Sequence, residues 1–143
     1  MKTLRGKIII FTISVVILGL LLQGCATSKY KVMYGIADWY YTNHVTLQAQ
    51  YDAGTPEQQA WLRKNVNPYM NMMQQAVIAM GAIDKGDSVK ASACASEILR
   101  IGTGIKYDIT KIVTAIKVKD YDTLFAESLA LKSFIIQKLS ERK

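Results

Sequence analysis

The sequence predicts an all-α protein in which an antiparallel, up-down-up-down four-helix bundle follows a cleaved N-terminal signal peptide. Three observations predict it: apolar residues recur at spacings of three and four through four long segments, no strand-like alternation persists, and short connections join the segments. Such seams suit helices that cross at roughly 20°, and short connections favour antiparallel neighbours. Half of the 143 residues are hydrophobic, which provides the core of one domain.

Residues 1–24 have the composition of an export signal. Lys2, Arg5 and Lys7 make the beginning positive, and residues 8–22 follow without a charge. A membrane-spanning helix needs roughly 20 apolar residues, so this run is short for a permanent anchor and typical of a signal peptide. The rest of the chain keeps 15 of the 18 basic residues and all 11 acidic ones, a balance too mild for a nucleic-acid-binding protein.

The segment closes on Leu22-Gln23-Gly24-Cys25, which resembles the lipobox of bacterial lipoproteins. The resemblance covers residues 1–25, and only Gln23 departs from the usual Ala or Ser. It implies cleavage after Gly24, a diacylglycerol on the Cys25 sulfur and an acyl chain such as palmitate on the new amine. Residues 25–28 are then a short tether and residues 29–143 a helical bundle domain. The alternative interpretation is an uncleaved single-pass anchor.

The residue after the lipidated cysteine bears on localisation. In lipoproteins of bacteria with two membranes, Asp at this position tends to retain the protein at the inner membrane, whereas this sequence has Ala26. The resemblance therefore implies the periplasmic leaflet of the outer membrane, or the outer face of the cytoplasmic membrane if the source has a single membrane. Two or three acyl chains anchor a protein far better than one myristoyl chain does.

The first two helices are predicted from their seams and their ends. The first is expected over about residues 29–51. The second begins with a capping box, in which Thr55 is the N-cap, Pro56 takes the first helical position and Gln58 lies three residues after the cap. The apolar seam of the first helix consists of Met33, Ala37, Tyr40, His44, Leu47 and Tyr51.

Pro68 falls inside the second helical segment, where a proline costs ~3 kcal/mol and bends a helix. Because the apolar seam keeps its phase across Pro68, we expect one kinked helix that ends at Gly86. In the alternative, Asn67 caps a new helix. The segment is also rich in methionine, and we expect Met70, Met72, Met73 and Met80 to fill the core, with an adaptable partner-binding groove as the alternative.

The third helix is expected from Asp87 to about Val118 as one long element. Gly102 and Gly104 lie within it at a cost of ~1 kcal/mol each relative to Ala, but the isoleucine seam, which includes Ile105, keeps its phase. Gly102-Thr103-Gly104 lacks the flanking strand and the Lys-Ser/Thr pair of a phosphate loop, so close packing or a kink is expected there. The fourth helix is expected to be capped by Asp120 or Asp122 and to bury Leu124, Leu131, Ile135 and Leu139.

Neither a catalytic, a metal nor a cofactor site is predicted. His44 is the only histidine, lies on a seam and lacks a partner at metal-ligand spacing, so a buried or half-buried, hydrogen-bonded histidine is expected. Cys94 sits among small residues and is expected to pack as a small hydrophobe, with a pairing to His44 or a redox role as minor alternatives. A c-type haem in its usual form is excluded because the sequence lacks CxxCH.

Two sets of residues are candidates for a membrane or partner surface. One is the aromatic set of the first helix, whose alternative role is contact with two neighbouring helices. The other is basic: an up-down-up-down topology gathers residues 29–31, 84–90 and 138–143 at the membrane end, with an acidic tip at the far end. The alternative is that these charges merely solubilise the helix ends. The candidates are Tyr30, Tyr34, Trp39 and Tyr41, and Lys85, Lys90, Lys138 and Arg142.

These features predict a non-enzymatic envelope lipoprotein, a small helical structural or partner-binding module. Its expected partners are the lipid bilayer, through acylated Cys25, and an envelope protein, with no nucleic acid. The alternative is a lipoprotein of a phage or mobile element that acts in exclusion, immunity or lysis, and this rests on class analogy. The genes next to its own would separate the two.

Overall fold

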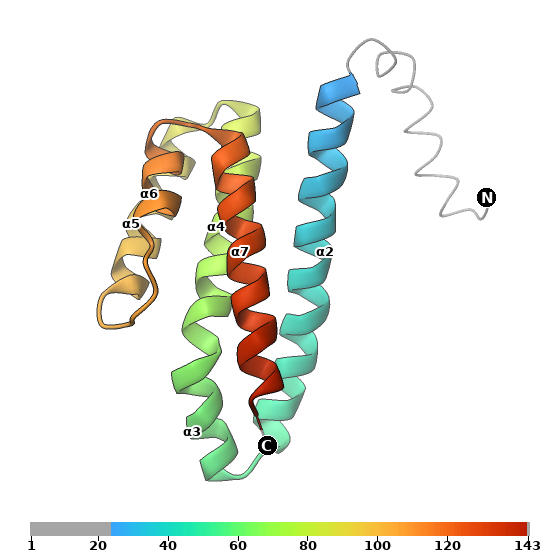
Figure 1. The fold of residues 1–143 in the computed structure, drawn as a ribbon, viewed down its shortest axis with the longest axis vertical. Coiled ribbons are helices and arrows are strands. Elements are labelled where there is room, and N and C mark those ends of the chain that lie inside the picture. Colours follow the sequence, from blue (N-terminus) through green and yellow to red (C-terminus); the bar gives the residue numbers. More distant parts are fainter. Residues whose placement is uncertain (1–23, 143) are drawn as a thin grey trace, which may run out of the picture. The chain divides into compact units, whose positions relative to one another are not determined.

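The computed structural model describes residues 24–142, and every regular element in that range is an α-helix (Figure 1). The all-α prediction is therefore confirmed. Residues 1–23, which hold most of the predicted signal peptide, lie outside the described residues, as does the Tyr30 side chain. The helices are α2 (Gly24–Ala53), α3 (Pro56–Asn65), α4 (Asn67–Lys85), α5 (Ser88–Gly102), α6 (Thr110–Lys117) and α7 (Tyr121–Ser140).

The chain divides into two compact units, residues 1–34 and residues 35–143. The described part of the first unit is the beginning of α2, which is helical from Gly24 onward. Residues 25–28, expected as a tether, are thus part of a helix. The second unit holds the rest of α2 and all the other helices.

The core of the second unit forms around α4, which packs against α3, α5, α6 and α7, while α6 also packs against α5 and α7. Helix α2 buries Ile36, Tyr40 and Leu47. The predicted inward residues of α7 are confirmed for Leu124, Leu131 and Ile135. The largest fully buried side chains are Val66, Met72, Met73, Met80, Ile98, Ile112, Ile116, Leu124, Ser128, Leu131 and Ile135.

The second predicted helix is two helices, separated by the single residue Val66. Its φ of −128° and ψ of −49° depart from helical values, two residues before Pro68. The ring of Pro68 would clash with the carbonyl four residues earlier in a regular helix, and Pro68 has no N–H to donate. Hydrogen bonds still link the two helices through Val66, whose N–H donates to Leu62 and whose carbonyl accepts from Met70, each over 3.0 Å. The expectation of one continuous helix was wrong, and Asn67 is the first helical residue instead of a cap.

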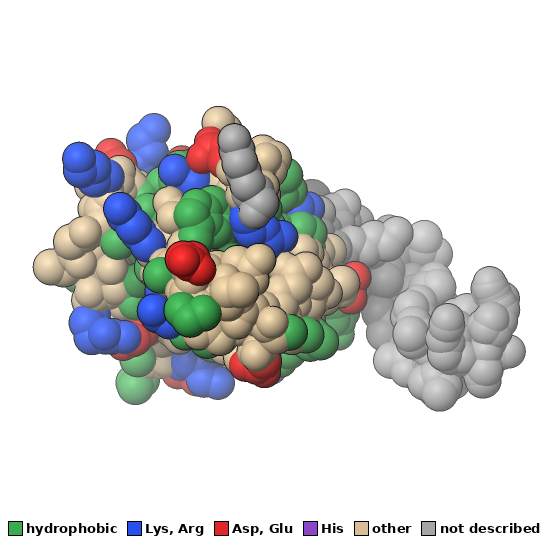
Figure 2. Space-filling model, turned by 90° about the horizontal axis from the view of Figure 1, so that it is seen from below, with side chains coloured by type: hydrophobic (Ala, Val, Ile, Leu, Met, Phe, Trp, Pro, Cys, Tyr) green, Lys and Arg blue, Asp and Glu red, His purple; other side chains and the backbone are tan. Residues whose placement is uncertain are grey.

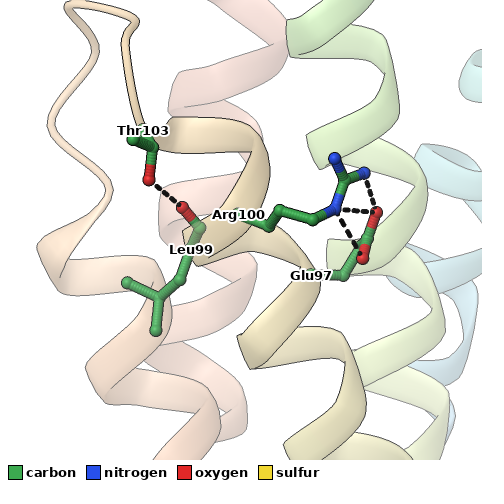
Figure 3. A network of polar contacts seen from close by, with 4 residues as sticks. All are labelled: Glu97, Leu99, Arg100 and Thr103. Atoms are coloured by element: carbon green, nitrogen blue, oxygen red, sulfur yellow. Dashed lines mark hydrogen bonds and ion pairs between the residues drawn. The ribbon is translucent and has the colours of Figure 1, made fainter.

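The third predicted helix is also two, and here the chain reverses direction. A Cβ on Gly102 would lie 2.5 Å from Cδ1 of Ile109, which folds back onto it, and Gly104 has a φ of +91° that favours glycine. The hydroxyl of Thr103 closes α5 by donating to the Leu99 carbonyl over 3.0 Å (Figure 3). The two glycines therefore end a helix instead of lying within one. Ile105, expected in the buried seam, is half-buried in the loop.

This additional reversal changes the direction of α7, which runs parallel to the second-unit part of α2 (Figure 1). The Lys132 ammonium lies 5.5 Å from the centre of the Trp39 ring, and the Arg142 side chain donates to Gln50 over 2.8 Å. Arg142 thus lies at the α2–α3 end of the unit, whereas Lys85 ends α4 at the opposite end. The expected gathering of residues 84–90 with 138–143 was wrong.

Candidate binding surfaces

A hollow of about 740 Å³ lies where α2 ends, α3 begins and the chain finishes. The predicted capping box is present here: the Gln58 N–H donates to the Thr55 hydroxyl, and the Thr55 N–H donates to the Gln58 side chain. This cap lets α3 begin directly after the turn at Gly54. Figure 2 shows this end with acidic, basic and hydrophobic side chains interspersed. Its lining consists of Gln50, Ala53, Gly54, Glu57, Gln58, Trp61, Leu62, Glu141 and Arg142.

The walls of this hollow are held in place by polar contacts between helices. The Gln59 side chain donates to the Tyr51 carbonyl over 2.7 Å, and the Arg63 guanidinium donates to the Tyr51 hydroxyl. Arg142, on the opposite wall, donates to the neutral side chain of Gln50. The volume lies within the range of roughly 300–1,000 Å³ that is typical of ligand pockets.

The hollow presents aromatic, aliphatic and charged groups. Trp61 is half-buried and offers an amphipathic ring beside Leu62, while Glu57 and Glu141 add carboxylates to the rim. Tryptophan and arginine are enriched among the residues that dominate protein–protein binding. The capping box predicts Gln58 at the start of a helix, but no sequence pattern singles out Trp61, and only the fold brings both residues to the C-terminal residues.

The predicted aromatic set on α2 separates into two groups. Tyr34 is 59% exposed and Tyr41 66% exposed, and Val45 follows on the same outer face at 64%. Trp39 is instead half-buried beside the Lys132 ammonium of α7. Tyr40 is buried, and burial raises the pKa of its hydroxyl, with a smaller contribution from Tyr41. Contact with neighbouring helices thus accounts for part of the set, and an exposed face for the rest.

His44 is exposed, so the expectation of a buried or half-buried histidine was wrong. Its ring stacks on Tyr40 with 5.5 Å between the ring centres, at the edge of a small hollow of about 160 Å³ that also includes Met70. Cys94 is buried, as expected of a packing residue, and burial raises the pKa of its thiol. Within residues 24–142, His, Cys, Asp and Glu side chains do not gather in any group of three that is able to hold a metal ion.

All four methionines of the cluster on α4 are buried, which confirms that they fill the core. The alternative, an exposed methionine groove, was wrong.

The four basic candidates do not share one surface. Lys85 and Lys90 flank the α4–α5 turn, whereas Lys138 pairs with Glu141 at 3.7 Å near Arg142 at the other end.

An aromatic cluster that the sequence did not predict fastens the loop between α5 and α6. Tyr107 of this loop lies 4.9 Å from Phe134 of α7 and 6.0 Å from Tyr69 of α4, measured between ring centres, and Tyr69 lies 4.8 Å from Phe134. The three rings are 27 to 65 residues apart in the sequence, so helical spacing provides no signal for them. The cluster holds the reversed chain against α4 and α7.

Among the described residues, no helix combines the length and the hydrophobicity that crossing a membrane requires. Comparisons with models of protein families, with curated proteins and with solved structures find no match to this chain.

Proposed function

We propose that this protein is a non-enzymatic envelope lipoprotein, anchored through acylated Cys25, whose helical second unit binds a protein partner. The observation that carries the proposal is the Leu22-Gln23-Gly24-Cys25 motif directly after a charged beginning and an uncharged apolar run. Ala26 favours the periplasmic leaflet of the outer membrane, or the outer face of the cytoplasmic membrane in a bacterium with one membrane.

The hollow around Trp61 is the proposed partner site. It combines an aromatic and aliphatic floor with carboxylates, amides and a guanidinium, as a surface for the anchoring side chains of a partner does. The guanidinium of Arg142 bonds to the neutral Gln50, and a partner carboxylate would replace that bond with a stronger, charge-assisted one.

The anchor is tested by the intact mass and detergent partitioning of the native chain and of Cys25→Ser. The native protein is expected to begin at Cys25 with the added mass of acyl groups and to enter the detergent phase. Cys25→Ser is expected to remain an uncleaved precursor without that mass. A native mature protein that carries no acyl mass would overturn the proposal.

The partner site is tested by photo-cross-linking in the native envelope from Glu57, at the rim of the hollow, with Ser92 on the exposed side of α5 as the matched control. A defined adduct is expected from position 57 alone, and it should disappear when Trp61→Ala removes the floor. An adduct that persists in Trp61→Ala, or that forms equally from position 92, would contradict this assignment.

A further inference from the structure

Helix α7 carries a second seam on the side that does not face the core. Its core side buries Leu124, Leu131 and Ile135, and the helix packs against α4 and α6. On the other side, exposed residues recur at alternating spacings of three and four up to the end of the helix. Two of them are large aliphatic residues, Leu129 at 40% exposure and Ile136 at 47%. We name this set the outer seam: Ala126, Leu129, Ser133, Ile136 and Ser140.

The outer seam has the heptad pattern of a helix that pairs with another helix. Its three small residues are seven positions apart, and so are its two large ones. Small side chains let two helices approach closely, and large ones fill the space between their backbones. The Ser140 hydroxyl donates to the Gln137 carbonyl over 2.7 Å, so this polar group keeps its partner when a neighbour covers it. A helix that is apolar on two sides is stable when both sides are covered.

The charged residues along this part of α7 are turned away from the outer seam. The Lys132 ammonium lies 5.5 Å from the centre of the Trp39 ring of α2, and Lys138 forms an ion pair at the end of its own helix. Glu127 is half-buried, and its carboxylate helps to raise the pKa of the Tyr107 hydroxyl on the inner side of the loop. The seam itself is uncharged, so an identical surface can meet it without the repulsion of like charges.

The outer seam is complementary to itself when two copies run antiparallel. In the register that places Leu129 opposite Ser133 of a second copy, Ile136 lies opposite Ala126 of that copy, because both pairings are symmetric about position 131. Each large side chain then meets a small one, as dense packing requires. A parallel pair would instead place Ile136 against Ile136 and Ser133 against Ser133, which alternates crowded layers with gaps.

We propose that the outer seam is the contact between two copies of this chain, which pair through antiparallel α7 helices around a two-fold axis at the level of position 131. A symmetric pair uses one patch that meets itself, and this patch extends over about 21 Å of helix. Ala130 and Gln137, exposed and uncharged, widen the contact on one side. The proposal depends neither on the lipid anchor nor on the hollow, whose residues Glu141 and Arg142 lie beyond the seam.

The test joins two differently tagged full-length copies produced in the same intact cells. One copy carries Ala126→Cys and the other Gln137→Cys, so the large residues of the seam are kept. The antiparallel register places these two positions next to each other. It separates the two copies of position 126 by about 15 Å along the helices, and the two copies of position 137 by about 18 Å.

A bis-maleimide whose span is shorter than these separations is expected to join the mixed pair several-fold more than either variant alone. Chains without an added cysteine give the background, to which Cys94 contributes little because it is buried. Equal joining in the mixed and the single combinations would overturn the proposal. A product at position 126 that contains a different protein would also overturn it, since another partner would then cover the seam.

A variant that places charge on the outer seam separates pairing from chance collision. Leu129→Glu with Ile136→Glu should abolish the mixed-pair product and leave the helix content unchanged, because both side chains lie at the surface. The matched control, Val89→Glu with Leu99→Glu, changes two exposed aliphatic residues of α5 and should leave the product in place. A product that survives the change to the seam, or that is lost equally in the control, would overturn the proposal. If the charged seam variant loses helix content, the comparison of mixed and single pairs with the large residues intact still decides.

Discussion

Arg142 donates a hydrogen bond from Nη1 to Oε1 of Gln50 over 2.8 Å, although the two residues are 92 positions apart in the sequence. The bond joins the ends of α2 and α7 and shows that these two helices run in the same direction. A four-helix, up-down-up-down arrangement would have placed these residues at opposite ends. The reversal at Gly102–Gly104 is what brings them together.

The parallel course of α2 and α7 predicts which cysteine pairs can be joined. Gln50→Cys with Arg142→Cys should be cross-linked by a short bis-maleimide, because the native side chains are in contact. Lys85→Cys with Arg142→Cys should not, since α3 and α4 together extend about 40 Å at 1.5 Å per residue between the two ends. Mobility on denaturing gels measures both, and efficient joining of the second pair would contradict the topology.

Gly102→Ala should destabilise the protein by about 1–3 kcal/mol, because the new methyl group would overlap Cδ1 of Ile109. Ile109→Val removes that atom, so the double variant should lose less than the two single losses combined. Chemical denaturation measures each free energy of unfolding. Gly81→Ala in α4 is the matched control: no atom lies within 4 Å of its new Cβ, and a gain of about 0.5–1 kcal/mol is expected.

Lys119→Gly should stabilise the protein by about 1 kcal/mol, because glycine adopts the left-handed conformation without the clash that a Cβ brings. Gly86→Ala should destabilise by a similar amount, because Gly86, which follows α4, also has a left-handed φ of 75°. Denaturant midpoints measured side by side check both signs. The same sign for the two changes would be incompatible with a left-handed backbone at both positions.

Ile112→Asp should unfold the protein, because an unpaired carboxylate would replace a side chain that has no exposed surface. Ile105→Asp should leave it folded, although the seam in the sequence places Ile105 in the core. Ile105 lies in the loop after α5 and remains partly exposed. Circular dichroism at 222 nm distinguishes a folded variant from an unfolded one. If Ile105→Asp lost as much helix as Ile112→Asp, the result would support the single long helix predicted from the sequence.

Stability should fall at alkaline pH as the tyrosines of the core ionise. Burial, with the Glu127 and Asp108 carboxylates, raises the pKa of Tyr107 above its ordinary value of about 10. A group whose folded pKa is raised contributes stability that is complete below the unfolded pKa and is lost as pH rises through the folded one. Unfolding midpoints between pH 8 and 11 should therefore decline above about pH 10. Tyr107→Phe should make that decline shallower, and an unchanged slope would exclude a role for this hydroxyl.

Local signals in the sequence were sufficient to predict much of the secondary structure. The Thr55–Gln58 capping box and the Asp120 cap act within one helical turn, and both form as predicted. Burial of the α4 methionines follows from their spacing on one helix. These features depend on neighbours three or four residues away, which the sequence shows directly.

Only the tertiary structure decided the topology. An apolar seam keeps its phase whether a segment is one helix or two, so the isoleucines around Gly102 and Gly104 did not reveal that the chain reverses between them. That choice depends on Ile109 packing against Gly102 and on Tyr107 reaching Tyr69 and Phe134, contacts with partners that are not at helical spacing. The same reversal separates Arg142 from Lys85 and builds the hollow around Trp61. Periodicity therefore determined which faces are apolar, and long-range packing decided what each face meets.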